Sequence, residues 1–376
     1  MVWRWRDLSQ KEREYTPSKS VRRPRHNDGM PRAPRHPPEP DALRAACDRL
    51  AARAAETACT GPWVSGAFRE LADAGVLAAF IDQDSGGAPA PDADRQAMFV
   101  AIAERCLTTG LALSQWAAAC QIIHRADAAT RRHWLPPLAR ADMFTTVGVS
   151  QLSTSRQHLG AAALTATRDT IGWRLDGLCP WVTGADSVDT IVTGAATDDG
   201  PLFFVVETGA DGVLIEPPLD MLALSGSRTS VVRLQGARPA AAIAPPSGGG
   251  LRTGGLTTSA LAIGAARASV AVLGREAEQR PTLGPIVERL RAEADDLART
   301  LLEAATAGIE PADRDRLRAE CNSLVVRAAQ AALTASKGAG FVNGHPVERL
   351  VREAMFFLVW SCPQAVADAC LAEAAG

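Results

Sequence analysis

Three short stretches of the 376-residue chain combine side chains that could bind or orient a ligand. Trp181 and Thr183 lie two residues apart in LDGLCPWVTGADSVDTIVTGA, where a flat ring can exclude water and a hydroxyl can form hydrogen bonds. Arg280, in RPTLG, carries a guanidinium suited to phosphate, and Gly338 and Gly340, in KGAGF, permit a tight turn. Taken alone, each stretch has a common structural explanation: a buried strand tryptophan beside a surface threonine, an arginine at a helix C-terminus, and a glycine turn.

The eight cysteines indicate neither a metal site nor a disulfide framework. They are scattered through the chain, with no C-x-x-C pair. Small apolar cysteines in an alanine-rich chain serve more often as core residues than as ligands. We therefore expect free thiols, no metal, and a reducing cytoplasmic location. The eight are Cys47, Cys59, Cys106, Cys120, Cys179, Cys321, Cys362 and Cys370.

Composition and charge argue against several kinds of partner. With 47% hydrophobic residues, the chain can bury a core large enough for two or three packed units. Its net charge of -2 provides no field that attracts nucleic acid or an anionic membrane. Charges interrupt the apolar runs, as Arg267 does in LAIGAARASVAVLG, so we expect no helix with the roughly 18 to 20 apolar residues of a membrane span.

Residues 1–40 differ from the rest of the chain. They are rich in arginine and proline and contain almost no aliphatic residues, so they cannot offset the entropy lost on ordering. We expect a disordered basic tail. Met30, just before the first helical pattern, is an alternative start to Met1.

The remaining sequence predicts an α+β multidomain fold. Helical spacing of apolar residues indicates a helical domain over residues 41–142. Short β-branched runs between turn residues then indicate an antiparallel β-domain over 143–245. Residues 246–376 begin with a glycine-rich connector and continue as a four-helix bundle. The four helices are expected at 256–279, 285–307, 311–336 and 346–374.

This order of domains, together with four motifs, resembles the acyl-CoA dehydrogenase family. Residues 61–87 are similar to that family's Pro-Trp to Gly-Gly segment, and residues 175–195 to its L-x-G-x-K-x-W-I-T-N-G-x-x-A-D pattern. RPTLG resembles R-x-x-F-G, and PVERLVREA nearly repeats P-V-E-R-L-x-R-D-A. The resemblance implies a flavoprotein oxidoreductase with FAD between the β-domain and the C-terminal helices and across a subunit interface. It also implies a homodimer or homotetramer and a small-molecule substrate such as an acyl-CoA.

The resemblance assigns cofactor roles to six residues. Ser150 replaces the Thr of the family's T-E-P-x-A-G-S-D segment, whose other elements are missing from GVSQLSTSRQH. Trp181 would lie against the isoalloxazine and the Thr183 hydroxyl near its polar edge. Arg280 would reach the FAD pyrophosphate of a neighbouring subunit, and the turn containing Gly338 and Gly340 would lie near the adenosine. The motifs are partial, because Cys179, Gly184 and Thr334 stand where the family has Lys, Asn and Gln.

The glutamate that serves as catalytic base in the family is missing from both of its usual positions. Counting along the motifs places Ser361 at one position and Gly254 at the other. A serine hydroxyl cannot remove an α-proton at neutral pH without an activating group. Three interpretations remain: an acyl-CoA oxidoreductase with another base, a flavin oxidase or monooxygenase, and a non-catalytic flavin-binding protein. His158 and Glu353 are candidate bases, although a loop histidine and a helical ion pair are the commoner roles. Glu348, Arg349 and Arg352 are expected to form structural ion pairs.

Overall fold

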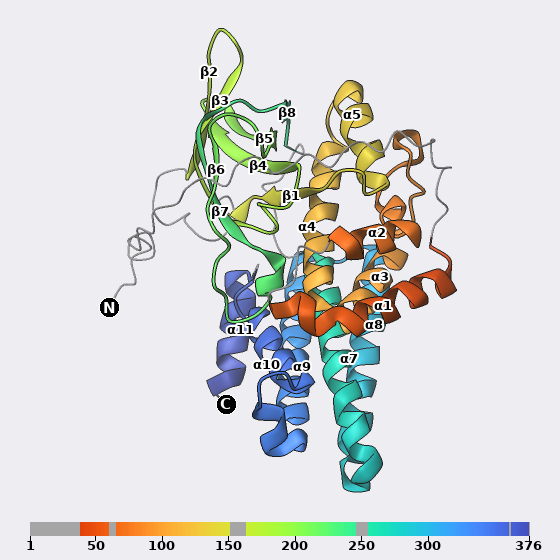
Figure 1. Ribbon diagram of the computed structural model, residues 1–376. Helices are drawn as coiled ribbons and strands as arrows, with labels where there is room; N and C mark the ends of the chain where they lie inside the picture. The colour runs from red at the N-terminus through yellow and green to blue at the C-terminus, as the bar shows by residue number, and fades with distance from the viewer. Residues whose placement is uncertain (1–37, 60–64, 151–162, 246–254, 361, 376) are drawn as a thin grey trace. The chain divides into compact units, whose positions relative to one another are not determined.

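A computed structural model describes residues 38–59, 65–150, 163–245, 255–360 and 362–375 (Figure 1). They belong to a compact unit formed by residues 34–376. In this unit a helical region precedes a β-sheet and a second helical region follows it, as the sequence predicts. The expected tail and the connector after residue 245 lie mostly outside the described residues, but Pro40, counted in the tail, is the first residue of helix α1.

The first helical region is centred on α4. Apolar and small side chains occupy nearly every position of this helix, so that within it only Gln115, Ala118 and Gln121 are not buried. Helix α5 begins after Asp127, whose carboxylate accepts hydrogen bonds from the backbone N–H groups of Ala129 and Thr130 in the first turn. The helices are α1 Pro40–Cys59, α2 Ser65–Asp73, α3 Asp92–Arg105, α4 Leu107–Ile123 and α5 Ala128–Ala139, with short 3₁₀ helices η2 Ala78–Phe80 and η3 Gln83–Ser85.

The sheet has eight strands, but it is mixed and not purely antiparallel as expected. Its order is β6-β7-β3-β2-β4-β5-β8, and β1 pairs with β4 outside this path. β1 and β2 both run parallel to β4, because β1 enters directly from the helical region and no hairpin connects it to β4. The strands are β1 Thr145–Gly148, β2 Leu164–Arg168, β3 Trp173–Val182, β4 Thr190–Thr197, β5 Gly200–Glu207, β6 Val213–Ile215, β7 Ser230–Ala237 and β8 Ala241–Ile243, with η5 Ser225–Ser227 before β7.

The C-terminal region contains one helix more than expected. The stretch predicted as a single helix from 346 to 374 forms α10 and α11, with Pro363 directly before α11. Proline lacks the N–H that a continuing helix needs and disfavours helical backbone in the residue before it, so the helix is interrupted. The helices are α7 Leu256–Gln279, α8 Gly284–Ala307, α9 Pro311–Ser336, α10 Pro346–Phe356 and α11 Gln364–Ala375, with η6 Pro281–Leu283 and η7 Lys337–Phe341.

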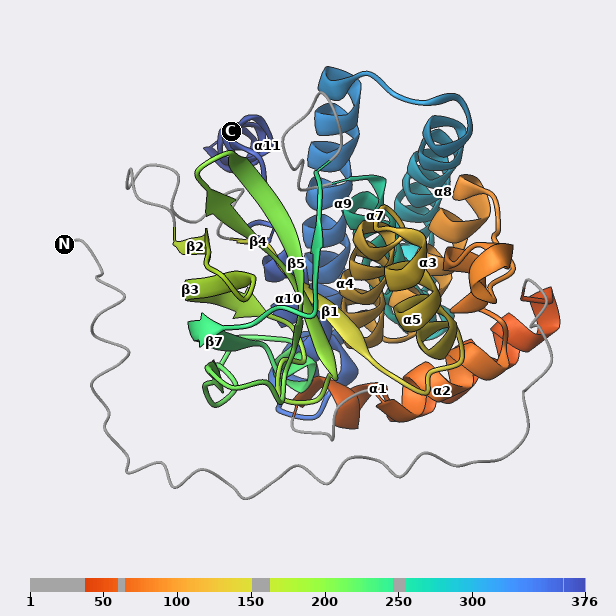
Figure 2. The same cartoon turned by 90° about the horizontal axis from the view of Figure 1, so that it is seen from above.

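Helix α7 joins the two helical regions. It packs against α3, α8 and α9, and Figure 2 shows the sheet to one side of α3, α4 and α7. A Cβ added to Gly264 would lie 2.5 Å from the carbonyl oxygen of Val100, so a glycine is required where α7 approaches the backbone of α3. Contrary to expectation, α7 is long and apolar enough to cross a membrane, but 72% of its most apolar 18-residue window is buried inside the protein. Such burial is typical of a core helix.

Candidate functional site

The C-terminal end of β1 packs tightly against β3. A Cβ on Gly148 would lie 3.0 Å from Cγ2 of Val182 and 3.4 Å from Cβ of Cys179. Thr193 of β4 donates a 2.6 Å hydrogen bond to the carbonyl of Gly148, which fixes the end of β1 from the other side. Ser150 follows this close contact by two residues, and Trp181 and Thr183 flank Val182. The structure therefore brings together the neighbourhoods of all three predicted sheet residues.

Thr183 lies in a turn that the start of β7 supports. Its side chain is buried, with Oγ1 3.4 Å from Oγ1 of Thr229, which in turn lies 2.8 Å from the Ser227 hydroxyl. The next residue, Gly184, adopts a left-handed φ of 67° and donates its N–H to the carbonyl of Ser227 at 2.9 Å. The turn thus holds the Thr183 hydroxyl in place, and the long contact with Thr229 leaves that hydroxyl able to bind another group.

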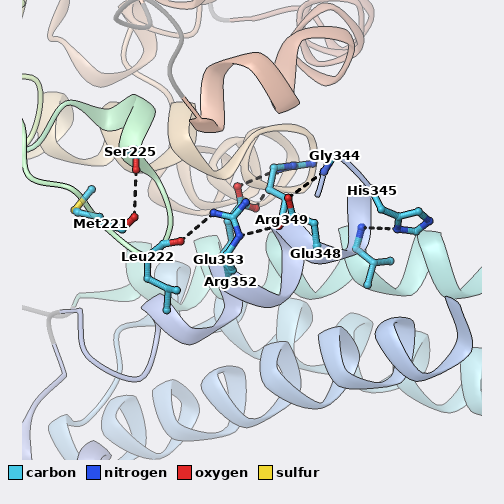
Figure 3. Close-up of polar contacts among 10 residues, drawn as sticks. Met221, Leu222, Ser225, Gly344, His345, Glu348, Arg349, Arg352 and Glu353 are labelled. Carbon is cyan, nitrogen blue, oxygen red and sulfur yellow. Dashed lines mark hydrogen bonds and ion pairs between the residues drawn. The ribbon is translucent and has the colours of Figure 1, made fainter. Parts of the chain in front are cut away.

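Helix α10 supports the loop before β7, which contains η5 and Ser227. Arg352 donates a 2.9 Å hydrogen bond from NH1 to the carbonyl of Leu222, three residues before η5 (Figure 3). Its Nε binds Glu348 at 2.7 Å, so the guanidinium is held on both sides. The sequence prediction that the PVERLVREA charges form structural ion pairs is therefore confirmed. Arg352 also holds the loop that carries Ser227, and this loop in turn supports the turn at Thr183.

Two hydroxyls in and just after β1 have no partner among the residues that the structure describes. Ser150 Oγ and Thr146 Oγ1 are inaccessible to solvent and make no hydrogen bond within the described residues. A buried hydroxyl without a partner costs free energy, which a ligand with a polar edge can recover. Trp181, which is half-buried, directly precedes Val182 in β3. This end of β1 therefore has a tryptophan close by in β3 and two hydroxyls unpaired among the described residues, which are groups that suit the face and the polar edge of a flavin.

Arg280 directly follows the C-terminal end of α7 and lines a surface groove. One of its nitrogens donates to Glu276 at 2.6 Å and to the carbonyl of Ala335 on α9, so the side chain joins the ends of two helices. The groove has a volume of about 460 Å³, within the range of small-ligand sites. Its walls are Leu273, Arg280, Leu283, Ile286, Arg327, Gln330, Ala331, Thr334 and Ala335.

The two predicted glycines near this groove have different roles. Gly340 is buried, and a Cβ there would lie 2.8 Å from Cβ of Ser336. Gly338 is exposed, and an added Cβ would meet nothing within 4 Å. Both belong to η7, which contacts α9 and α10, whereas β3 contacts other strands. Figure 1 shows the C-terminal end of α7 well away from the sheet, so the six predicted residues form two groups in one chain and not one site.

The C-terminal end of α10 is held by two buried polar residues that the sequence did not identify. Arg318 donates to the carbonyl of Trp360 at 3.2 Å, and Asn322, one turn later on α9, donates to the carbonyl of Phe357 at 2.9 Å. Arg318 is 1% exposed, and its Nε and NH1 have no hydrogen-bond partner among the described residues. Burial lowers the pKa of Arg318 to about 10, which still leaves a cation at neutral pH. The signal was its position in the buried stripe formed by Cys321, Val325 and Ala329.

Of the candidate bases, only Glu353 lies within the described residues. Ser361, Gly254 and His158 lie outside them. Glu353 is buried, with both carboxylate oxygens 3.1 Å from NH1 of Arg349. A carboxylate bound in this way inside a helix packing surface functions as half of an ion pair, which favours the structural role over that of a base.

Comparisons with known proteins agree with this fold. Residues 41–142 match the family model described as the acyl-CoA dehydrogenase N-terminal domain. A probable acyl-CoA dehydrogenase of Bacillus subtilis is 23% identical over 325 residues, which cover 78% of this chain and 85% of the relative. Butyryl-CoA dehydrogenase from Megasphaera elsdenii superposes with a TM-score of 0.77 at 18% identity, over 89% of this chain and 97% of that one. A glutaryl-CoA dehydrogenase from Mycobacterium smegmatis, in complex with FADH2, superposes with a TM-score of 0.73 at 19% identity, over 89% and 95%.

The helix, sheet and helix arrangement is thus the fold seen in these two solved acyl-CoA dehydrogenase structures. The match of residues 41–142, the curated relatives and the structural neighbours all support the acyl-CoA dehydrogenase family.

Proposed function

We propose that the protein is an FAD-dependent oxidoreductase that acts on CH–CH groups of an acyl-CoA or related substrate, with a base other than the usual glutamate. The observation that carries the proposal is the buried Ser150 hydroxyl, which has no partner among the described residues, at the corner of the sheet bordered by Trp181 and Thr183. A ligand at this corner would give the Ser150 hydroxyl the partner that no described residue provides. A flavin ring edge carries the acceptors and donor that would remove this cost.

Each residue at this corner has a distinct task towards the cofactor. The Ser150 and Thr183 hydroxyls would bind the polar edge of the ring, and the Trp181 ring would cover one face and exclude water. The Thr183 turn is held by Ser227 and by the loop that Arg352 binds, so its hydroxyl needs little reorganisation on binding. Bound flavin would supply the electron acceptor for the oxidation.

The position of Arg280 and of the two η7 glycines, far from the sheet corner, supports a homo-oligomer. Arg280, Gly338 and Gly340 lie at the far end of the C-terminal helices, away from the sheet corner of their own chain. A groove lined by two arginines suits the phosphates of a cofactor held mainly by another subunit. We therefore propose a homodimer or homotetramer in which the ends of one cofactor contact two subunits. A flavin-loaded monomer in sedimentation would contradict this arrangement.

The missing glutamates favour a second candidate function, that of a flavin oxidase or monooxygenase, which we test alongside the first. With Ser361 and Gly254 at the two positions, the chain has no carboxylate where the family removes the substrate's α-proton. An oxidase or monooxygenase, in which reduced flavin meets oxygen, needs no such base. A non-catalytic flavin protein is the remaining alternative.

The deciding experiment is the absorption spectrum of the purified protein, followed by anaerobic titration with a panel of acyl-CoAs. Flavin bands that bleach with an acyl-CoA support the first candidate. Bands that stay unbleached with acyl-CoAs but disappear with another reductant and return quickly in air support the second. A colourless protein that takes up no added FAD would reject both.

Matched variants connect this result to the sheet corner. Ser150→Ala and Thr183→Val should each weaken FAD binding about twofold to tenfold, since a net hydrogen bond contributes about 0.5 to 1.5 kcal/mol. Ser187→Ala is the control, because the Ser187 hydroxyl already donates to Asp186 at 2.8 Å. Equal FAD affinity in all three variants would mean that the cofactor does not bind at this corner.

A further inference from the structure

Lys337, the first residue of η7 and the one directly after α9, has a backbone conformation that suits glycine. Its φ is 52° and its ψ is -145°. Leu224 and Arg228 also have positive φ, but their ψ values of 25° and 43° place them in the ordinary left-handed region. Lys337 lies outside that region, in backbone space that a residue with a Cβ occupies only at a cost. Glycine would be free of strain here, and the G-G-x-G-F/Y pattern that KGAGF resembles has glycine at this position.

Lys337 is also unusual in its residue type. Lysine occurs only at positions 11, 19 and 337, so every other cation after residue 19 is an arginine or a histidine. The side chain is exposed, and it forms no ion pair with any residue that the structure describes. Neither packing nor a local ion pair therefore explains a lysine at a strained position.

The surroundings provide a third observation. Ala335, two residues earlier, lines the groove of about 460 Å³ and accepts a hydrogen bond from Arg280. The two arginines of the groove are already balanced by carboxylates, since Arg280 pairs with Glu276 and Arg327 with Glu293. Lys337 adds a cation that no carboxylate of the described residues balances. Lys337 thus brings an unbalanced positive charge two residues along the chain from Ala335, a residue of the groove wall.

We propose that Lys337 binds a phosphate group of the dinucleotide cofactor at this end of the groove. The inference rests on the proposed FAD-binding function and assigns to this chain a phosphate ligand that the resemblance does not supply. An exposed ammonium reaches a phosphate as a mobile point charge, whereas the two paired arginines are held in place by their carboxylates. The phosphate contact offsets the backbone strain that the lysine introduces.

The proposal predicts effects of opposite sign for one substitution. Lys337→Gly should raise the melting temperature of the flavin-free protein by roughly 1 to 3 °C, because strain is relieved. The same variant should bind FAD about tenfold more weakly, and its affinity should depend less on salt. Lys337→Ala keeps the strain and removes the charge, so it should lose affinity with no gain in stability. Lys337→Arg should keep affinity near that of the wild type.

Calorimetric titration with FAD and, separately, with inorganic pyrophosphate distinguishes this proposal from the proposed function. If the wild type binds both and Lys337→Gly binds both equally well, the role of Lys337 is wrong and flavin binding stands. If the wild type binds pyrophosphate but not FAD, and Lys337→Gly binds pyrophosphate more weakly, the lysine is a phosphate ligand and the flavin assignment is wrong. If the wild type binds neither, both proposals are overturned.

Discussion

Both carboxylate oxygens of Glu353 lie 3.1 Å from NH1 of Arg349, one turn earlier on α10 (Figure 3). The side chains are only 3% and 17% exposed, so the pair is largely removed from water. Burial raises the pKa of Glu353, and the attraction to Arg349 opposes this rise without cancelling it. On the same helix, the hydrogen bond from Arg352 lowers the pKa of Glu348. Two glutamates five residues apart therefore shift in opposite directions.

We predict that Glu353→Gln gains stability relative to the wild type as pH rises. Because the native pKa of Glu353 is above the unfolded value of 4.5, the native state holds more protons than the unfolded state between these two pKa values. The wild type therefore loses stability as pH rises through that window, and the glutamine variant does not. Urea unfolding from pH 4.5 to 7.5 measures the difference.

Glu348→Gln is the matched control and should behave in the opposite way. In the wild type, the lowered pKa of Glu348 stabilises the fold above pH 4.5, and this stability is lost as pH falls through the native pKa. The variant should be less stable than the wild type by about 1 kcal/mol at neutral pH, with the difference vanishing in acid. Parallel pH profiles for the two variants would contradict both assignments.

The two glycines of η7 should respond differently to the same substitution. Gly340→Ala should destabilise the fold by about 1 to 3 kcal/mol, since its Cβ would lie 2.8 Å from Cβ of Ser336 and 3.2 Å from Cδ1 of Leu333. Gly338→Ala, with nothing within 4 Å, should change stability by no more than about 0.5 kcal/mol. Denaturant midpoints of the two variants measure this. Equal losses would show that η7 packs differently.

Arg280→Ala should weaken FAD retention about tenfold to a hundredfold, because a charge-assisted hydrogen bond contributes about 1.5 to 3 kcal/mol. Arg280 also binds the Ala335 carbonyl, so the melting temperature of the flavin-free variant must be measured together with its affinity. Arg316→Ala is the control: this exposed arginine of α9 pairs with Asp313 at 2.8 Å, and its side chain is 70% exposed. Loss of stability with unchanged affinity would limit Arg280 to a structural role.

Ser361→Glu should speed flavin reduction by at least one acyl-CoA. A general base contributes about a hundredfold to ten-thousandfold to the rate. Flavin reduction in the wild type should therefore be slower by about this factor than in a protein with a carboxylate base. Ser361→Gln has nearly the same size and no carboxylate, which makes it the control. Stopped-flow reduction under anaerobic conditions compares the three proteins. Rapid reduction by the wild type, equal in all three, would mean that another residue is the base.

The sequence predicts the helices of the C-terminal region well where apolar periodicity continues without interruption. α7 and α9 begin and end at the predicted residues, and α8 begins one residue earlier than predicted. Periodicity alone cannot show that Pro363 separates α10 from α11, since alanine-rich sequence continues on both sides. It also hides β2, Leu164–Arg168, because five residues with an arginine at the end give little signal, and this strand makes one of the two parallel pairings with β4.

The site could be predicted only where a motif names the residue. Trp181 and Thr183 are candidates because their motif is recognisable, although the support of Thr183 by Ser227 and Arg352 depends on contacts between distant parts of the chain. Arg318 and Asn322 were missed because a charged or amide residue on a helix is normally assigned to solvent. The conformation of Lys337 could not be foreseen either, since a non-glycine residue rarely occupies such backbone.

The contact at Gly264 has a consequence for synthesis of the protein. α3 and α7 meet there, yet residues 106–255 must be translated before α7 begins to emerge. At roughly 5 to 20 residues per second, this delay is on the order of ten seconds. During that time the buried face of α3, which includes Val100 and Ala103, has no α7 to cover it. Until α7 leaves the ribosome, this face of α3 therefore lacks the helix that covers it in the folded protein.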